Sequence, residues 1–583
     1  MDTRRAILWV IFFMSLLMLW DSYMRHSGQG SLFGAPTTKT SSSETTATPA
    51  VVGATNNTGA TVPMAGKADG ISVPTPGKTI KPTTAAPTAS ASIATGEKYI
   101  LKNKDIEIEI DSQGARIVKA VLLNQISDAY EGKRVVLFDQ ASQRKYEAQS
   151  GLIGQSTNQT LYPNHTIGFK KTSLREGLDA TRNIVLTGES GGMKLTKTYS
   201  LDETGYALKV SHTVQNTGAD TVSPMLYLQL MRSGDRPPGE SQFYQTFTGP
   251  AIYNEEGKFQ KVDFSEIEKN KTSFVKNAND GWFGIVQHYF VSAWIPKNEA
   301  PREFYTRRVD ANLYSVGLIQ ALPAMAPGAQ QTHEAVLFAG PQIQDTLEKL
   351  APGLDLVVDY GWLTVIAKPI YWLLEKLYHL VANWGWAIVL LTVIIKVLFY
   401  PLAAASYKSM AKMKAVTPRL MKLRETYAND KVKLNQAMME LYKTEKINPL
   451  GGCLPIVVQI PVFIALYWVL LASVEMRNAP WIGWVTDLAA PDDFFGTIPG
   501  INMPIGLLPI VMAITMFIQT KLNPAPPDPI QAKVMLFMPI VFSVFFFFFP
   551  SGLVLYWLVN NVLSIAQQWY VTRQIEQAAA AHR

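Results

Sequence analysis

One lysine, Lys396, lies inside the apolar run WAIVLLTVIIKVLFYPL at residues 386–402. A charge within a membrane segment costs about 3 kcal/mol or more, so it usually faces a partner, water or the membrane surface. The five apolar segments that include and follow this run contain no Asp or Glu, which excludes a carboxylate partner from within them. Lys396 therefore either snorkels to the nearby cytoplasmic surface or faces water inside a helical bundle.

Polar side chains in the other apolar segments favour the second explanation. They lie in the middle of their segments or in the cytoplasmic half: Gln459, Thr515, Gln519, Ser543, Asn560, Asn561, Ser564, Gln567 and Gln568. Helical spacing places Trp557 on one face with Asn560, Asn561, Ser564 and Gln568. The outer halves are apolar and aromatic, as in FFFFF at 545–549.

This pattern predicts a hydrophilic groove that opens to the cytoplasm and is closed on the outside. Its predicted residues are Lys396, Gln459, Thr515, Gln519, Trp557, Asn560, Asn561 and Ser564. Lys396 would attract acidic residues of a short peptide tail, and water in the groove would shorten the apolar path across the membrane. In the alternative, the amides join neighbouring helices while Lys396 snorkels.

Other chemistries are less compatible with these residues. A channel must open on both sides, and an ion-coupled transporter needs membrane carboxylates. The catalytic patterns HExxH, GxSxG and GxxxxGK[ST] are absent from the chain. We interpret His165, His212, His288 and His333 as ordinary surface or core histidines. We therefore expect no enzymatic activity, no cofactor and no metal.

Composition and the N-terminal residues indicate a membrane protein with an exported part. Of 583 residues, 48% are hydrophobic and only 17% are charged, and the single cysteine, Cys453, excludes an intrachain disulfide. Arg4 and Arg5 precede an apolar segment that ends near Trp20, without a small-residue cleavage site. We expect an uncleaved anchor with its N-terminus in the cytoplasm; the alternative is a cleaved signal.

Two further regions precede the later apolar segments. Residues 28–95 are rich in Ser, Thr, Ala, Pro and Gly and predict a disordered tether. KDIEIEIDS alternates isoleucines with acids, and similar short runs recur up to about residue 350, which predicts a large antiparallel β-sandwich. Residues 360–381 place ionisable groups on one helical face beside aromatics, typical of a helix on the outer membrane surface rather than an additional span.

The basic residues of the short loops set the orientation. The loop at 402–452 is strongly basic, whereas the loop at 474–502 is mainly acidic, so the first is cytoplasmic. We expect six transmembrane helices. The predicted organisation is an N-terminal transmembrane anchor at 1–27, the periplasmic tether at 28–95, the periplasmic β-domain at 96–352, the interfacial helix at 353–382, transmembrane helices at 383–401, 453–473, 503–520, 534–549 and 553–569, the cytoplasmic hairpin at 402–452, a periplasmic loop at 474–502, a cytoplasmic loop at 521–533 and a cytoplasmic tail at 570–583.

The basic cytoplasmic loop is itself helical in composition. Pro418 and the turn at 428–430 are expected to break it into a helical hairpin. Its interleaved bases and methionines predict contact with varied hydrophobic segments or a ribosome, or a position on anionic lipid. The predicted contact residues are Lys408, Met410, Lys412, Met413, Lys414, Arg419, Met421, Lys422, Arg424, Met438 and Met439.

Three segments resemble the YidC family of membrane protein insertases. They are NPLGGCLPIVVQIPVFIALYWVL at 448–470, the lysine segment ending in YPL, and FMPIVFSVFFFFFPSGLVLYWLVNNVLSIAQQ at 537–568. The resemblance covers the five later spans, which would form the insertase core, and the hairpin. The tether and β-domain look like the Gram-negative form, whose periplasmic domain is a β-supersandwich similar to mutarotase folds.

The resemblance implies insertion and folding of inner-membrane proteins, alone or beside the Sec translocon, without nucleotide hydrolysis. The implied partners are nascent membrane proteins, the Sec translocon, the ribosome and signal recognition pathway, and anionic lipids, with no specific recognition of nucleic acid. In the family the residue matching Lys396 is usually arginine, so the planar donor fork is replaced by a point charge. Trp557 and Gln519 match a substrate-contacting aromatic and a polar groove residue. The alternatives are a transporter with a periplasmic sensory domain and an envelope enzyme acting on sugars.

Overall fold

The computed structural model describes most of the chain from residue 96 onward. The described ranges are 96–127, 132–141, 144–156, 158–174, 176–237, 246–427, 430–445, 454–498, 503–523 and 529–581. They divide into two compact units at Val358. The expected anchor at 1–27 and tether at 28–95 lie outside the described residues.

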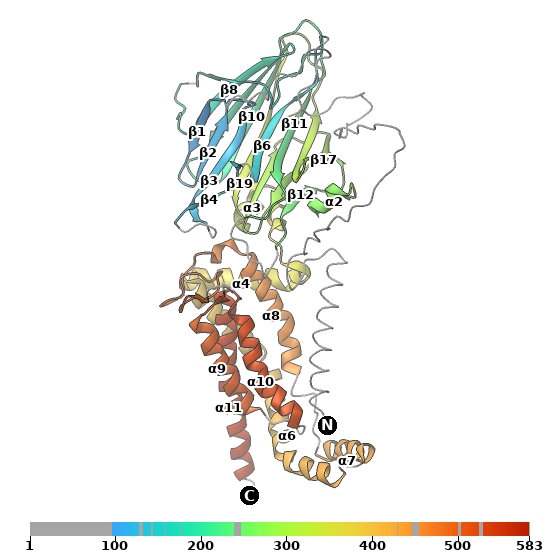
Figure 1. Ribbon diagram of the computed structural model, residues 1–583, viewed down its shortest axis with the longest axis vertical. Coiled ribbons are helices and arrows are strands. Elements are labelled where there is room, and N and C mark those ends of the chain that lie inside the picture. The colour runs from blue at the N-terminus through green and yellow to red at the C-terminus, as the bar shows by residue number, and fades with distance from the viewer. Residues whose placement is uncertain are drawn as a thin grey trace, which may run out of the picture. The chain divides into compact units, whose positions relative to one another are not determined.

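The first unit consists of two antiparallel sheets (Figure 1). One sheet has the order β1-β2-β3-β6-β11-β18-β17-β14, with β4 on β3 and β5 on β6. Its strands are β1 Lys98–Lys102, β2 Ile106–Asp111, β3 Arg116–Ile126, β4 Arg134–Val136, β5 Asp139–Ala141, β6 Arg144–Ile153, β11 Met225–Ser233, β14 Asn277–Ala278, β17 Arg302–Asp310 and β18 Leu313–Ala321.

The other sheet has the order β13-β12-β15-β16-β19-β10-β9-β8-β7. Its strands are β7 Lys170–Thr172, β8 Asn183–Ser190, β9 Met193–Leu201, β10 Ala207–Asn216, β12 Gly249–Asn254, β13 Lys258–Lys261, β15 Trp282–Val286, β16 Phe290–Pro296 and β19 Gln330–Pro341. Short helical segments accompany the sheets: α2 Phe264–Glu268, α3 Gln344–Leu350 and the 3-10 turn η1 Leu354–Val357.

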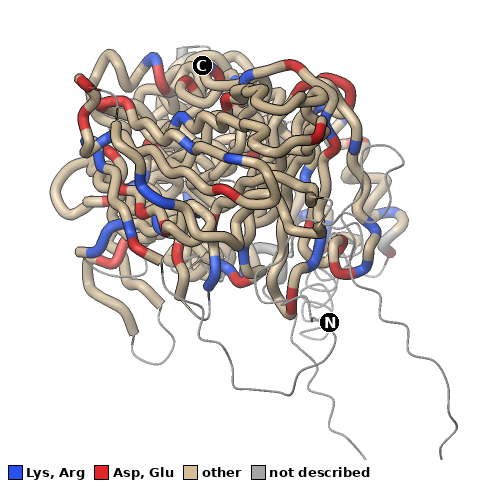
Figure 2. The backbone as a smooth tube through the Cα atoms, turned by 90° about the horizontal axis from the view of Figure 1, so that it is seen from above, with Lys and Arg blue, Asp and Glu red and all other residues tan. Residues whose placement is uncertain are grey.

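The alternating pattern of the sequence determines which face of each strand is buried. In β2, Ile106, Ile108 and Ile110 are all buried, as the alternation with acids predicts. The two sheets face each other across this core: Tyr199 of one sheet donates to the carbonyl of Ala115 beside the other at 2.6 Å. Acidic and basic positions are interspersed along the described backbone (Figure 2). The antiparallel β-sandwich is therefore confirmed.

The core also contains charged groups. Arg116 pairs with Asp111 at 3.0 Å and with Glu147 at 3.1 Å. Lys197 of β9 is fully buried, and its Nζ donates to the carbonyls of Gly114 and Ser150 at 2.9 Å each. Burial, with a smaller contribution from the charge of Arg116, lowers the pKa of Lys197 from 10.5 to about 7.

The stability of this unit is expected to rise with pH because of Lys197. The unfolded chain keeps the lysine protonated up to pH 10.5, whereas the folded unit releases the proton near pH 7, so stability increases between those values. From pH 7 to about 9.5 the gain from this one group is about 3 kcal/mol. This pH dependence is measured by thermal unfolding of the full chain in detergent, with the protease resistance of the β-sandwich as the readout.

The variant Lys197→Met should flatten this pH dependence. Lys194→Met is the matched control, because Lys194 lies on the same strand in an exposed ion pair with Glu189. Equal pH slopes for Lys197→Met and the unmodified chain would show that Lys197 is not the group responsible.

The second unit is helical. Its helices are α4 Thr364–Val381, α5 Trp384–Leu398, α6 Tyr400–Thr426, α7 Lys431–Thr444, α8 Leu454–Ala472, α9 Leu507–Leu522, α10 Pro529–Phe546 and α11 Ser551–Ala581. Short elements are the 3-10 turns η2 Gly361–Leu363 and η4 Val474–Met476 and the strands β20 Thr497–Ile498 and β21 Met503–Pro504. Helix α11 packs against α5, α6, α8 and α9, α10 packs on α9, and α4 packs on α5 and α8.

Tested singly for length and hydropathy, none of the helices in the described ranges reaches the threshold for a membrane crossing. The pair α5 and α6 reaches it together, with a bend of 66° between them. Val458–Ala472, Leu507–Leu522 and Lys533–Phe546 are shorter apolar helices.

Two details of the helical unit differ from the sequence predictions. Helix α6 continues through Pro418, where a break was expected. Val416 and Leu420 are buried on either side of this proline against α7, so packing offsets the backbone hydrogen bond that Pro418 cannot donate. Helix α11 extends to Ala581, so most of the expected tail at 570–583 continues the preceding helix.

Candidate functional site

The end of α5 places Lys396 in the helical unit. Asn383 begins the helix, because its side chain accepts a hydrogen bond from the backbone N–H of Trp386 at 3.1 Å. The helix ends at Leu398, and Pro401 lies in the first turn of α6 beyond the bend. Lys396 thus occupies the last turn of α5, where its positive charge also complements the helix dipole.

Lys396 is hydrogen-bonded to α11. Its Nζ donates to Ser564 Oγ at 2.7 Å, and Ser564 Oγ donates to the backbone carbonyl of Asn560 at 2.7 Å. The hydroxyl of Tyr407 in α6 is also hydrogen-bonded to Ser564. No carboxylate among the described residues forms an ion pair with Lys396, in agreement with the absence of acids from these segments.

Other polar side chains connect α11 to the helices around it. Gln459 of α8 donates to the hydroxyl of Tyr556 at 2.6 Å. Asn561 donates to Thr515 of α9 at 3.4 Å, and Gln568 donates to the carbonyl of Leu522 at 3.3 Å. Five of the predicted groove residues, Lys396, Gln459, Thr515, Asn561 and Ser564, therefore form contacts between helices, and α11 takes part in every one of these.

Several polar atoms of α11 are buried without a hydrogen-bond partner among the described residues. They are Trp557 Nε1, Asn560 Oδ1, Gln567 Oε1 and Gln568 Oε1. Trp557 packs edge-on against Phe463 of α8, with ring centres 4.6 Å apart. Since buried polar atoms normally have a protein or water partner, these four atoms mark a stretch of α11 that can bind water or a peptide.

Two polar residues do not join this network. Gln519 is half-buried in α9, and Ser543 donates to the carbonyl of Pro539 in its own helix at 2.6 Å. Conversely, Tyr407 and Tyr556 were not predicted as site residues, because their rings fit an apolar sequence pattern. Tyr556 could have been identified by its position four residues before Asn560, on the same helical face.

The hairpin of α6 and α7 has a small core of its own. Val416 and Leu420 are buried against Met413, Met438, Leu441 and Tyr442. Two of the predicted contact methionines, Met413 and Met438, therefore pack inside the hairpin, whereas Met421 and Met439 are 51% and 62% exposed. Of the other predicted contact residues, Lys408, Lys412, Lys414, Arg419 and Lys422 are exposed, whereas Met410 and Arg424 are half-buried.

Comparison with known proteins identifies the family. Residues 99–373 match the family model described as YidC periplasmic domain, and residues 376–578 match the model described as 60Kd inner membrane protein. The chain is 51% identical over 585 residues to the membrane protein insertase YidC of Cupriavidus necator, which covers 100% of this chain and 99% of the relative. It is 50% identical over 587 residues to that of Janthinobacterium sp. (strain Marseille), covering 99% of each.

Among solved structures, an active YidC insertase with its first transmembrane domain resolved matches with 18% identity and a TM-score of 0.38, covering 82% of this chain and 95% of that chain. The family assignment follows from the full-length relatives and from the two family models, which together cover both units. The chain belongs to the YidC family of membrane protein insertases.

Proposed function

We propose that the polar face of α11, together with Lys396, receives the polar end of a nascent membrane protein, whose apolar segment then moves into the lipid. The chain is a membrane protein insertase by family, an inner-membrane protein with a periplasmic domain, and this family is not one of enzymes. Membership of this family gives no support to the transporter alternative. We further propose that the chain works without catalysis or a cofactor.

One observation carries this proposal. Lys396 is held by the hydroxyl of Ser564 rather than by a carboxylate. Within two turns of Ser564 on α11, Trp557 Nε1 and Asn560 Oδ1 are buried without a hydrogen-bond partner among the described residues. An ammonium that donates to one neutral oxygen keeps donors for a second partner. Acidic residues of a substrate are suited to that position, because an unpaired charge in an apolar environment gains most from an opposite charge.

The topology that goes with this mechanism is the one expected from the loops: six spans, both chain ends in the cytoplasm and α4 on the outer surface. Charge asymmetry supports it, since exposed bases are concentrated in α6, whereas the loop at 474–502 is mainly acidic. The exposed side chains of α4 combine Trp372 with Lys368 and Lys376, and Trp362 of the preceding turn η2 is also exposed, which suits a helix at a membrane surface.

The hairpin is proposed to make the first contact with the substrate. Exposed Met421 and Met439 offer adaptable apolar surface beside exposed lysines. That combination of apolar and basic groups can bind a nascent chain, a ribosome delivered by the signal recognition pathway, or anionic lipid. The Sec translocon is proposed as a further partner of the helical unit.

Site-specific photocrosslinking tests the groove. Photoreactive residues at positions 396, 519 and 557 are expected to crosslink to a single-span substrate with an acidic tail during its insertion. The matched control is position 543, whose native serine bonds within its own helix. Crosslinks from 557 and 396 but not from 543 support the groove; equal labelling from 543, or none from 557, places the substrate path elsewhere.

A further inference from the structure

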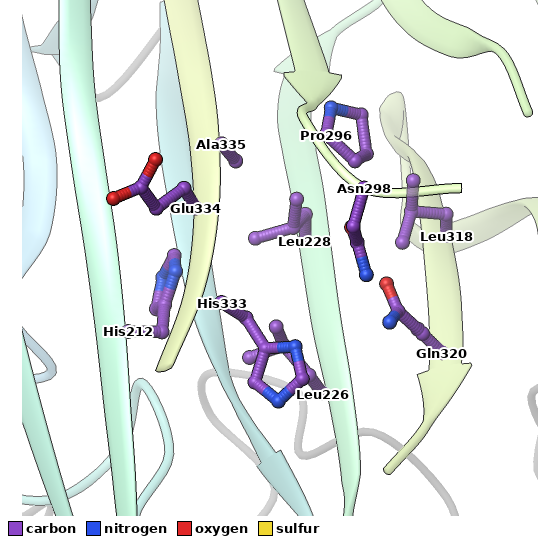
Figure 3. A pocket seen from close by; sticks show the side chains of 10 residues that line it. All are labelled: His212, Leu226, Leu228, Pro296, Asn298, Leu318, Gln320, His333, Glu334 and Ala335. Atoms are coloured by element: carbon purple, nitrogen blue, oxygen red, sulfur yellow. The ribbon is translucent and has the colours of Figure 1, made fainter. Parts of the chain in front are cut away.

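Two features of the chain lie outside the groove and the hairpin. In the β-sandwich, His212 of β10 and His333 of β19 lie opposite each other and line a cavity of about 10 Å³ (Figure 3). This volume corresponds to one water molecule, and His212 is already hydrogen-bonded to Ser150 at 2.9 Å, so the cavity has room only for water. In the helical unit, exposed aromatic side chains cluster on the segment between α8 and α9.

This segment, the loop cap at 474–498, is folded on itself. The backbone N–H of Leu488 donates to the carbonyl of Ala479 at 3.0 Å. The buried carboxylate of Asp492 accepts from the backbone N–H of Leu508, in the first turn of α9, at 2.7 Å. That carboxylate satisfies a backbone donor which has no partner within the helix, so the loop cap is fixed to the start of α9.

The loop cap is also attached to the starts of α5 and α11. The side-chain amide of Asn383 donates to the carbonyl of Trp481 at 3.2 Å, and a Cβ atom added at Gly385 would clash with the Trp481 ring, so glycine permits this close approach. The backbone N–H of Gly552 donates to the carbonyl of Leu488 at 2.9 Å. The loop cap is therefore held at the end of the unit where α5, α9 and α11 begin.

The loop cap exposes large apolar side chains in two short runs. Ile482 and Trp484 form one run, Phe494 and Phe495 form the other, and each of the four is between 38% and 58% exposed. The two runs lie side by side, because the ring centres of Trp484 and Phe494 are 5.4 Å apart. The indole N–H of Trp484 donates to Asp492 at 3.3 Å, which orients this ring. A contiguous exposed apolar surface of this kind marks an interaction site, whereas single exposed side chains do not.

The charges of the loop cap favour lipid as the partner. Its one basic residue, Arg477, is buried, and of its four acidic residues only Asp493 is exposed. The exposed surface is therefore apolar and aromatic with almost no charge. Such a surface suits the boundary between lipid headgroups and acyl chains, where the aromatic residues of membrane proteins are enriched.

The aromatic surface also continues onto the apolar helices. The backbone N–H of Phe495 donates to the carbonyl of Ile505 at 2.9 Å, two residues before α9, and α9 in turn exposes Ile514. Trp386, exposed in the first turn of α5, packs edge-on against Trp481 with ring centres 5.6 Å apart. In a protein of the inner membrane, exposed apolar residues on such helices face lipid, so the loop cap extends a surface that lipid already covers.

We propose that the loop cap is inserted into the interfacial layer of the outer leaflet, where Trp484, Phe494 and Phe495 lie between lipid headgroups and acyl chains. Its partner is the phospholipid bilayer rather than another protein. This inference rests on the proposed function, because it takes the segment at 474–502 to be periplasmic. Because the loop cap is hydrogen-bonded to α5, α9 and α11, its position in the lipid also fixes the depth of these helices, and with it the depth of Lys396.

The test measures the depth of single spin labels in the full chain, reconstituted in vesicles of phosphatidylethanolamine and phosphatidylglycerol. Cys453, the one native cysteine, is replaced by serine, and a nitroxide is attached to Phe494→Cys or, separately, to Trp484→Cys. Both labels are expected to collide several-fold more often with oxygen, which partitions into lipid, than with a water-soluble nickel chelate. Leu178→Cys is the matched control, because Leu178 has a similar exposed fraction in the β-sandwich, and its label should show the reverse.

A second measurement separates this inference from the proposed function. A membrane-impermeant thiol reagent is applied to Lys412→Cys, at an exposed position of the hairpin, in right-side-out and inverted membrane vesicles. Reaction only in inverted vesicles, together with lipid-exposed labels at positions 484 and 494, supports the inference. The same reaction with water-exposed labels overturns the inference alone and leaves the aromatic surface for a protein partner. Reaction in right-side-out vesicles contradicts the topology and overturns the proposed function as well.

Discussion

Lys396→Glu is expected to reduce the inserted fraction of a single-span protein with an acidic tail about tenfold or more, whereas Lys396→Arg is expected to retain insertion. Glutamate would replace a donor to Ser564 Oγ by an acceptor and would repel acidic residues of the substrate. Arginine keeps the charge and the donors. Lys396→Ala should be intermediate, since it removes the attraction without adding repulsion. The measurement is the fraction of substrate inserted into proteoliposomes.

Lys170→Glu is the control for this series, because it makes the same charge change at an exposed position of β7, outside both the groove and the hairpin. Substrates without acidic residues in their tails should be much less sensitive to Lys396→Glu. If the glutamate, alanine and arginine variants all insert the acidic substrate as the unmodified chain does, Lys396 only snorkels and the electrostatic account is wrong.

Loss of the α6–α7 hairpin is expected to abolish insertion, whereas deletion of roughly residues 100–340 leaves it largely intact. A point variant tests the role of the hairpin without deleting it. Leu420 is 1% exposed in the hairpin core, so Leu420→Asn should destabilise the hairpin by about 3 kcal/mol or more. Insertion by this variant should fall to near that of the hairpin deletion.

Met421→Asn is the matched control, since Met421 is the next residue and is 51% exposed. Its effect measures direct substrate contact, whereas that of Leu420→Asn measures the fold of the hairpin. Full insertion by Leu420→Asn, together with protease cleavage showing an unfolded hairpin, would contradict the role proposed for this segment.

The alternation of apolar and polar residues was sufficient to predict the strands of the β-domain and their buried faces. Ile106, Ile108 and Ile110 alternate with acidic residues, which predicts that the isoleucine face of β2 is buried. The structure confirms this. The register that pairs His212 with His333 was not predictable, because more than a hundred residues separate them and only strand order brings them together.

In the candidate site, residue type was predictable but partners were not. An uncompensated lysine in an apolar run required a polar partner, yet nothing in the spacing identified Ser564 or Tyr407. The break expected at Pro418 did not occur, because tertiary packing on Val416 and Leu420 outweighs the local cost of a proline within a helix. Helix propensity depends only on local sequence, whereas the partners of Lys396 and the continuous helix through Pro418 both depend on packing against neighbouring helices.

The uninterrupted course of α11 has a mechanical consequence. Its 31 residues extend about 46 Å at 1.5 Å per residue, against about 30 Å for the hydrocarbon layer. A helix is stiff over this length, so a force applied near Ala581 also turns the part that carries Ser564. The far end of α11 is thus mechanically coupled, through one continuous helix, to the residues that hold Lys396.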